Sequence, residues 1–285
     1  MPNLLDIRRR IKSTKNTQQI TKAMKMVSAS RLRRTSERAM NARPYADRIA
    51  DVHASVLARM PELDSPLYNQ RQGKTLILVL AGDKGLCGAF NSNIFKAVSN
   101  LLEREGQDRC AVVAIGKKAA SYFRKHPADV LESYEDVFRN VTFSLAEEIS
   151  RNAIQMFTEG GYGKVILLFN KFKNVLVQEV IEQQLLPLTA VAQDDLEEMP
   201  GVEHLAEPSL DAILADLAPQ VVMTQVFQAL LESCAAEHAA RMTAMDAATN
   251  NAKEMIGKLT LEMNKARQAA ITKELIEVVS GAAAL

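Results

Sequence analysis

The last segment of the chain, from Val226 to the C-terminus, repeats a spacing of three and four residues without a break. This is the heptad pattern of a helix that packs along a second helix. Small side chains bury little apolar area but let two backbones approach closely, so this seam is predicted to set register more than stability. Its positions are Val226, Ala229, Ser233, Ala236, Ala240, Thr243, Ala247, Asn250, Glu254, Gly257, Leu261, Asn264, Gln268, Ile271, Leu275, Val278, Ala282 and Leu285.

The first 60 residues contain one proline, Pro44, and no glycine, which predicts another long helix with a possible kink near Arg43. Its distal half has a seam, whereas the half from Lys12 to Arg38 is too polar to show one. The distal seam is Ala39, Ala42, Ala46, Ile49, His53, Val56 and Met60.

We therefore expect a long antiparallel coiled coil of residues 1–60 and 209–285, with a central domain formed by residues 61–208. Matching the two seams and the points where the helices leave that domain predicts that facing residues have numbers summing to 271 or 272. Small side chains then face small ones. The predicted pairs are Leu32 with Ala240, Thr35 with Ala236, Ala42 with Ala229, and Ala46 with Val226.

On this register Met1 lies level with Ala270, and residues 271–285 continue alone for roughly 20 Å. This tip is apolar, and its main residues are Ile271, Leu275, Val278 and Leu285. An apolar tip is not stable in water, so it is predicted to sit in an apolar sleeve formed by other subunits.

The middle of the chain alternates apolar strands with amphipathic helices, which predicts a small α/β sheet domain of Rossmann-like type. Residues 61–73 and the acidic segment 193–208 are interpreted as connectors. No apolar run exceeds one strand in length, so no membrane span is expected. The predicted strands are Lys74–Ala81, Cys110–Ile115, Lys164–Asn170 and Val175–Leu186, and the predicted helices are one starting near Asn91, Lys117–Lys125 and Ser144–Thr158.

Charge is divided unevenly along the chain. Residues 1–60 hold fourteen Lys and Arg against four Asp and Glu, whereas the whole chain has a net charge of only +1. The basic first helix therefore predicts an acidic partner.

A glycine loop, Gly82 to Gly88, follows the first strand and raises the possibility of phosphate binding. Its G-x-x-G-x-x-G spacing is neither the dinucleotide fingerprint nor a Walker motif, so a tight turn is the favoured interpretation. We expect no bound cofactor, no metal site and no catalytic residues. The three cysteines, Cys87, Cys110 and Cys234, are too far apart to indicate a disulfide framework or a zinc site.

Two function classes remain open. One is a mechanical subunit whose long helical arm is gripped by other subunits, and the other is a nucleic-acid-binding protein that uses its basic helix on phosphates. The hypothesis of nucleic-acid binding does not explain the function of the long C-terminal helix.

Three stretches resemble the gamma subunit of F-type ATP synthase. They are residues 20–30 (ITKAMKMVSAS), residues 83–88 (DKGLCG), and residues 264–275 (NKARQAAITKEL) with the closing SGAAAL. They occur in the order and at the separations typical of that family. Lys84 stands where the family usually has arginine, which keeps the charge.

The resemblance implies a rotor shaft of the proton-translocating ATP synthase, which couples ion-driven rotation to ATP synthesis by the beta subunits. The implied partners are the alpha and beta subunits, the epsilon subunit and the membrane c-ring. The chain would be a non-catalytic, peripheral subunit at the cytoplasmic face of the bacterial inner membrane. By position, Met24 and Lys25 would lie near the acidic lever loops of the beta subunits, and Arg267 and Gln268 near another beta loop.

Overall fold

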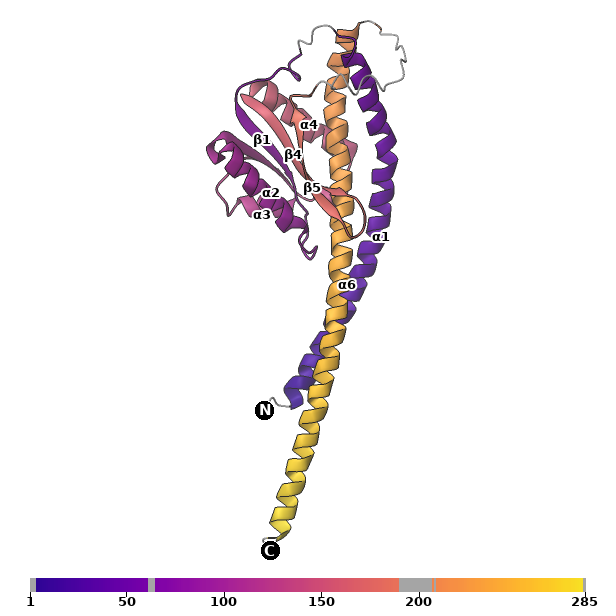
Figure 1. Ribbon diagram of the computed structural model, residues 1–285, viewed down its shortest axis with the longest axis vertical. Helices are drawn as coiled ribbons and strands as arrows, with labels where there is room; N and C mark the ends of the chain where they lie inside the picture. Colours follow the sequence, from indigo (N-terminus) through magenta and orange to yellow (C-terminus); the bar gives the residue numbers. More distant parts are fainter. Residues whose placement is uncertain (1–3, 61–64, 190–206, 208, 284–285) are drawn as a thin grey trace. The chain divides into compact units, whose positions relative to one another are not determined.

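The computed structural model describes residues 4–60, 65–189, 207 and 209–283 (Figure 1). The chain divides into two compact units, one formed by Met1–Ala29 with Arg241–Leu285 and the other by Ser30–Ala240. Two long helices, α1 (Leu4–Leu57) and α6 (Leu210–Ala283), contribute to both units.

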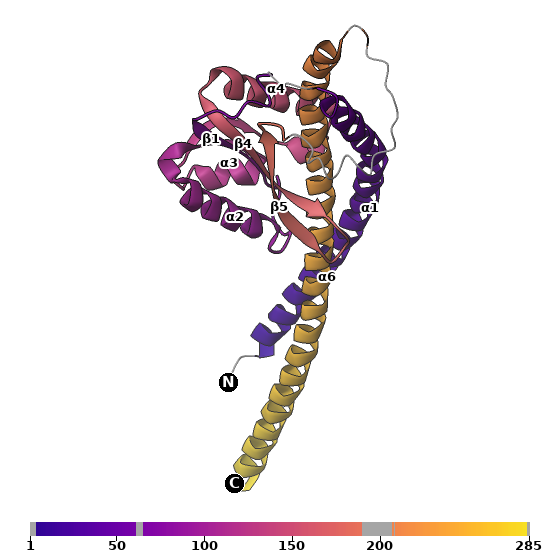
Figure 2. The same ribbon diagram turned by 45° about the horizontal axis from the view of Figure 1, so that its top comes forward.

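A five-stranded sheet forms the centre of the larger unit (Figures 1 and 2). The strand order is β3-β2-β1-β4-β5, and every neighbouring pair is parallel except β4 with β5. Full burial on both faces explains the continuous apolar sequence of β1 and β2. The strands are β1 (Lys74–Leu80), β2 (Cys110–Ile115), β3 (Asp129–Tyr134), β4 (Tyr162–Phe172) and β5 (Gln178–Leu186).

Helices α2 (Phe90–Glu105) and α3 (Lys117–Phe123) cover one face of this sheet. The buried residues of α2 recur every three or four positions, which is the spacing of one helical face. They pack on alternate residues of the strands, such as Ile77, Val79 and Ile166. Two short 3₁₀ turns, η1 (Gln107–Arg109) and η2 (Val137–Arg139), connect elements of this unit.

The opposite face of the sheet packs on α4 (Phe143–Glu159) and on the parts of α1 and α6 that belong to this unit. The resulting core is the larger of the two hydrophobic clusters on the sheet, and it joins Ala39 and Ile49 of α1 to Val222 and Leu230 of α6. The expected α/β class with long terminal helices is confirmed.

Strand β3 is the element that the sequence analysis did not predict. Its residues are mostly exposed, and Val130 and Leu131 remain 38% and 40% accessible to solvent. An exposed edge strand lacks the continuous apolar run that identifies a buried parallel strand. The predicted strand Val175–Leu186 begins later than expected, at Gln178, because the Asn174 side chain caps the hairpin by accepting from the amides of Leu176 and Val177.

The segment interpreted as a polar connector, residues 61–73, contributes to the core in its described part. Leu67 and Tyr68 are buried, and the Leu67 carbonyl accepts a hydrogen bond of 2.8 Å from the amide of Leu188. The Tyr68 hydroxyl contacts the ring of buried His53, and burial lowers the pKa of His53 and raises that of Tyr68. The other predicted connector, 193–208, lies outside the described residues apart from Glu207.

Both long helices continue through their prolines, Pro44 in α1 and Pro219 in α6. Helix α6 also carries an 18-residue window with a mean hydropathy of 1.2, one third of it buried. By length and composition alone it is therefore long and apolar enough to cross a membrane. Core helices of water-soluble proteins share this property.

The loops at the carboxyl ends of β1, β2 and β3 are joined by one side chain. Asp83 accepts hydrogen bonds from three backbone amides, those of Lys117 at 3.0 Å, Asp136 at 3.1 Å and Phe138 at 2.8 Å. A carboxylate with three amide donors satisfies groups that the strands cannot pair. Asp83 therefore holds the glycine loop against the two neighbouring loops.

Replacing Asp83 with alanine is expected to lower the free energy of unfolding by about 2 kcal/mol, because three amides lose their acceptor. Urea denaturation followed by circular dichroism measures this change. Asp108→Ala is the matched control, since Asp108 is exposed and makes no side-chain hydrogen bond or ion pair with the described residues. Equal stability of the two variants would contradict this role of Asp83.

Candidate partner interface

The smaller unit consists of the start of α1 and the last part of α6, which run antiparallel (Figure 1). Polar side chains join them. The Lys25 ammonium lies 2.6 Å from a carboxylate oxygen of Asp246, and the Thr249 hydroxyl donates to the Thr21 hydroxyl at 2.8 Å. The residue numbers of these pairs sum to 271 and 270.

The proximal half of α1 does have a seam, contrary to the sequence analysis. Ile7, Ile11, Thr21 and Ser28 are buried at positions separated by four, ten and seven residues, all of which fit the heptad spacing. The same spacing continues to buried Leu32. Hydroxyl groups occupy positions of this seam that usually hold leucine, so the apolar pattern of the sequence does not reveal it.

The seam predicted for α6 is wrong beyond Arg241. Ala247, Asn250, Glu254, Gly257 and Leu261 are exposed, and Leu261 retains 64% of its accessibility. Met245 and Ala252 are buried instead, and Thr249 is half-buried. The contact face is therefore shifted by two positions from the predicted one.

Cations cover the exposed side of α1 in this unit, and apolar side chains lie among them. Ile20, Met26 and Val27 remain 60%, 67% and 54% accessible. Met24 is half-buried, and Lys25 is engaged with Asp246. Exposed apolar groups beside positive charge are characteristic of a surface that another protein covers. The exposed cations are Arg8, Arg9, Arg10, Lys12, Lys15 and Lys22.

The end of α6 presents a further apolar surface. Arg267 and Gln268 are exposed, and every residue from Ile271 to Ser280 is exposed as well. Ile271, Leu275 and Val278 retain 49%, 60% and 69% of their accessibility. Leu285, the last predicted tip residue, lies outside the described residues. In this unit α6 continues past the start of α1 (Figure 1), so these side chains have no cover from it.

In the larger unit most of the predicted seam residues are buried. Leu32, Val226, Ala229, Ala236 and Ala240 are buried, whereas Ala42 and Ala46 are half-buried.

Two contacts between α1 and α6 bracket these alanines. The Arg43 guanidinium lies 3.1 Å from buried Glu232, and the Gln228 amide donates to the Ala39 carbonyl at 3.4 Å. The residue numbers sum to 275 and 267, so the long side chains reach about one turn in opposite directions around the predicted register. The alanine pairing itself stays a prediction.

The glycine loop lies where doubly wound sheets bind ligands, at the carboxyl end of β1 beside β4, where the strand order reverses. Here α6 fills that position. The Glu237 carboxylate, 3% exposed, accepts from the Lys84 amide at 3.4 Å, and one turn earlier Ser233 accepts from the Asn170 amide at 3.2 Å. A carboxylate of the chain therefore occupies the place where a phosphate would be cradled.

Comparison with known proteins gives consistent matches over the whole chain. A family model described as ATP synthase matches residues 3–285. The ATP synthase gamma chain of Chlorobaculum parvum is 45% identical, over 100% of this chain and 99% of its own length. That of Desulforamulus reducens is 46% identical over both full lengths.

Comparison with solved structures also gives matches to chains of ATP synthases. A chain in the central stalk and c-ring of the Tetrahymena thermophila mitochondrial ATP synthase is 29% identical, with a TM-score of 0.61 over 80% of this chain and 99% of that one. A chain of the Euglena gracilis mitochondrial ATP synthase matches with a TM-score of 0.70 over 99% of this chain and 94% of its own, and at 18% identity it shows the fold alone.

Terminal helices paired beside an α/β sheet define the class of central-stalk subunits. Within that class, the chain belongs to the ATP synthase gamma-chain family. The ATP synthase to which such a subunit belongs is a membrane-associated complex. The alternative of a nucleic-acid-binding protein finds no support.

A pair of cysteines at Ala42 and Ala229 is expected to form a disulfide readily, because the register sum of 271 brings their β-carbons within bridging range. Non-reducing electrophoresis after mild oxidation measures the yield. The matched control is the pair Ala42 and Ala236, one heptad away. Preferential cross-linking of the control pair would show that the register is misplaced.

The isolated chain is expected to bind no ATP at the glycine loop, since the Glu237 carboxylate occupies the anion position and repels phosphate. Isothermal titration calorimetry with Mg-ATP measures this. A micromolar dissociation constant that disappears in Lys84→Ala would contradict the expectation.

Proposed function

We propose that this chain is the central-stalk rotor subunit of a proton-translocating ATP synthase in a bacterial inner membrane, at its cytoplasmic face. It would couple the rotation of a membrane c-ring to ATP synthesis at the catalytic sites of beta subunits. The observation that carries the proposal is the helix pair of the smaller unit, with its cationic face and uncovered apolar end. Family membership supports the same role.

The apolar end of α6 supports a specific arrangement. Ile271, Leu275 and Val278 have side chains 49%, 60% and 69% accessible. We propose that a ring of alpha and beta subunits covers them as an apolar sleeve, since burial of such side chains stabilises a complex by about 25 cal/mol per Å². An apolar bearing surface has no directional bonds to break as the shaft turns.

The cationic face of α1 is proposed to contact acidic loops of the beta subunits. Met24 and Lys25 would lie at this contact, and Arg267 and Gln268 at a second beta loop further along α6. Lys25 would act together with Asp246, since their ion pair is only half-exposed and leaves little net positive charge at that point. Met24 then supplies the apolar part of the contact.

The catalytic residues belong, on this proposal, to the beta subunits, and the chain acts through its shape. Its two helices present different side chains on different sides, so identical beta subunits around them meet unlike surfaces. Each catalytic site would therefore have a different nucleotide affinity at any moment. The epsilon subunit and the c-ring are the further partners proposed for the chain.

The partner set is tested by affinity purification of a tagged copy of the chain from cells lacking the untagged one. Alpha, beta and epsilon subunits are expected to co-purify in the presence of mild detergent, together with the c-ring. Recovery of nucleic acid without these subunits would contradict the proposal.

Replacing Met24 with lysine is expected to reduce coupling more than stability, because it adds a charge at a moving, partly dry contact. In membrane vesicles, ATP-driven proton pumping per ATP hydrolysed is expected to fall by at least about half, with assembly unchanged. Met40→Lys is the control, since it adds the same charge to α1 at an exposed methionine outside the proposed contact. Unchanged pumping in Met24→Lys would show that the assignment is wrong.

A further inference from the structure

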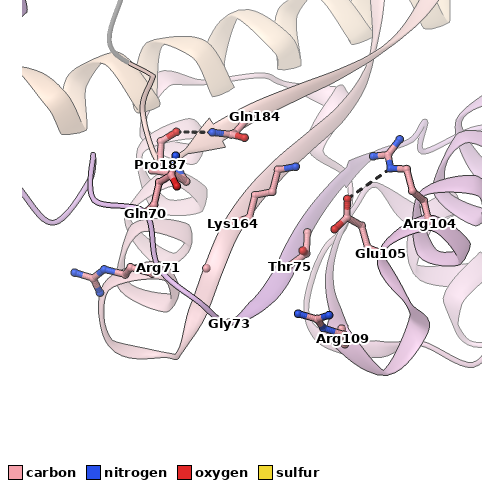
Figure 3. A pocket seen from close by; sticks show the side chains of 11 residues that line it. Gln70, Arg71, Gly73, Thr75, Arg104, Glu105, Arg109, Lys164, Gln184 and Pro187 are labelled. Atoms are coloured by element: carbon pink, nitrogen blue, oxygen red, sulfur yellow. Dashed lines mark hydrogen bonds and ion pairs between the residues drawn. The ribbon is translucent and has the colours of Figure 1, made fainter.

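A cavity of about 490 Å³ lies at the amino ends of β1 and β4, between the sheet and the end of α2 (Figure 3). It lies at the edge opposite to the glycine loop and to Glu237. Its size is typical of sites for small molecules. The lining residues are Gln70, Arg71, Gly73, Thr75, Arg104, Glu105, Arg109, Gly163, Lys164, Gln184 and Pro187.

Four of the lining side chains are cations, and two of them are held by the protein itself. Arg71 donates to the carbonyl of Thr158 at 2.8 Å and stacks on Phe157, so it closes the end of α4. Arg104 contacts Glu182 and lies 3.5 Å from Glu105. Both charges are thereby fixed in position before any ligand arrives.

The other two cations, Lys164 and Arg109, form no ion pair with any residue in the described part of the chain. Figure 3 shows the Lys164 ammonium, from β4, lying between Gln184 of β5 on one side and Thr75 of β1 and Glu105 of α2 on the other. Lys164 is half-buried, so its uncompensated charge has limited access to water. A partly desolvated ammonium without a counter-charge favours an anion.

A neutral donor points to the same chemistry. Thr75 is 7% exposed and lines the cavity, and its hydroxyl has no hydrogen-bond partner among the residues that the structure describes. Because none of the described protein groups occupies this hydroxyl, it can donate a hydrogen bond to an oxygen atom bound in the cavity. Thr75 and Lys164 are also neighbours across the β1–β4 ladder.

We propose that this cavity binds a small, multiply charged phosphate-class oxyanion, held by Lys164, Arg109 and the Thr75 hydroxyl. The lining residues include no exposed large apolar side chain that could enter a bilayer, which favours a soluble ligand over a lipid headgroup. Glu105 limits the affinity through repulsion and selects for a ligand that donates a hydrogen bond. The site is independent of the rotor role.

Inorganic diphosphate is the probe, titrated calorimetrically into the full chain at low salt. Binding is expected, and Lys164→Gln is expected to weaken it about tenfold, the effect of one lost charged hydrogen bond. Thr75→Val is expected to weaken it by a smaller factor, and Glu105→Gln to strengthen it. The matched control is Lys171→Gln, on the same strand at its other end, which is expected to leave the affinity unchanged.

Three outcomes would overturn the proposal. One is the absence of diphosphate binding by the correctly folded chain. Another is an equal loss of affinity in Lys164→Gln and Lys171→Gln, which would mean that general surface charge is responsible. The third is retention on vesicles containing phosphatidate with no binding of free diphosphate, which would assign the cavity to a lipid. Circular dichroism of each variant establishes that it is folded.

Discussion

Close packing of α6 against two different surfaces is the constraint on which the larger unit depends. Gln228 and Glu232 of this helix contact α1, and Ser233 and Glu237 contact the ends of β4 and β1. Ser233, Ala235, Ala236 and Ala239 have no accessible surface. Only small side chains allow backbones to approach on two sides of one helix. The same segment places Glu237 at the carboxyl end of β1, so the geometry that joins the helix to the sheet also closes the usual ligand position of this fold.

The sequence predicted the architecture well because its strongest signals are long and regular. Buried β1 and β2 have uninterrupted apolar runs, and the helices of the central domain have clear apolar faces. Edge strand β3 was not predicted because most of its side chains are exposed to solvent, so its sequence needs no continuous apolar run. The role of Leu67 and Tyr68 was missed because two apolar residues among turn residues form no period.

The interface was harder to predict than the fold. Thr21 and Ser28 are buried between helices, where a sequence pattern of hydrophobicity treats them as surface. The shift of the α6 seam beyond Arg241 has a similar origin, since half-buried Thr249 and buried Ala252 are no more apolar than exposed Ala247. The role of Asp83 could not be predicted either, because the three backbone amides that donate to its carboxylate come from loops distant in the sequence.

The hydroxyl-lined seam of the smaller unit has a consequence for how the helix pair comes apart. Water can replace the hydrogen bond between Thr21 and Thr249 with little change in free energy, whereas Leu32 and Ala39 lose apolar burial when they separate. The stretch of α1 from Thr21 to Ser28 is therefore held less strongly than the apolar positions before and after it, Ile7 and Ile11 on one side and Leu32 on the other. The free energy needed to separate the two helices thus varies along the pair, so they can come apart locally rather than all at once.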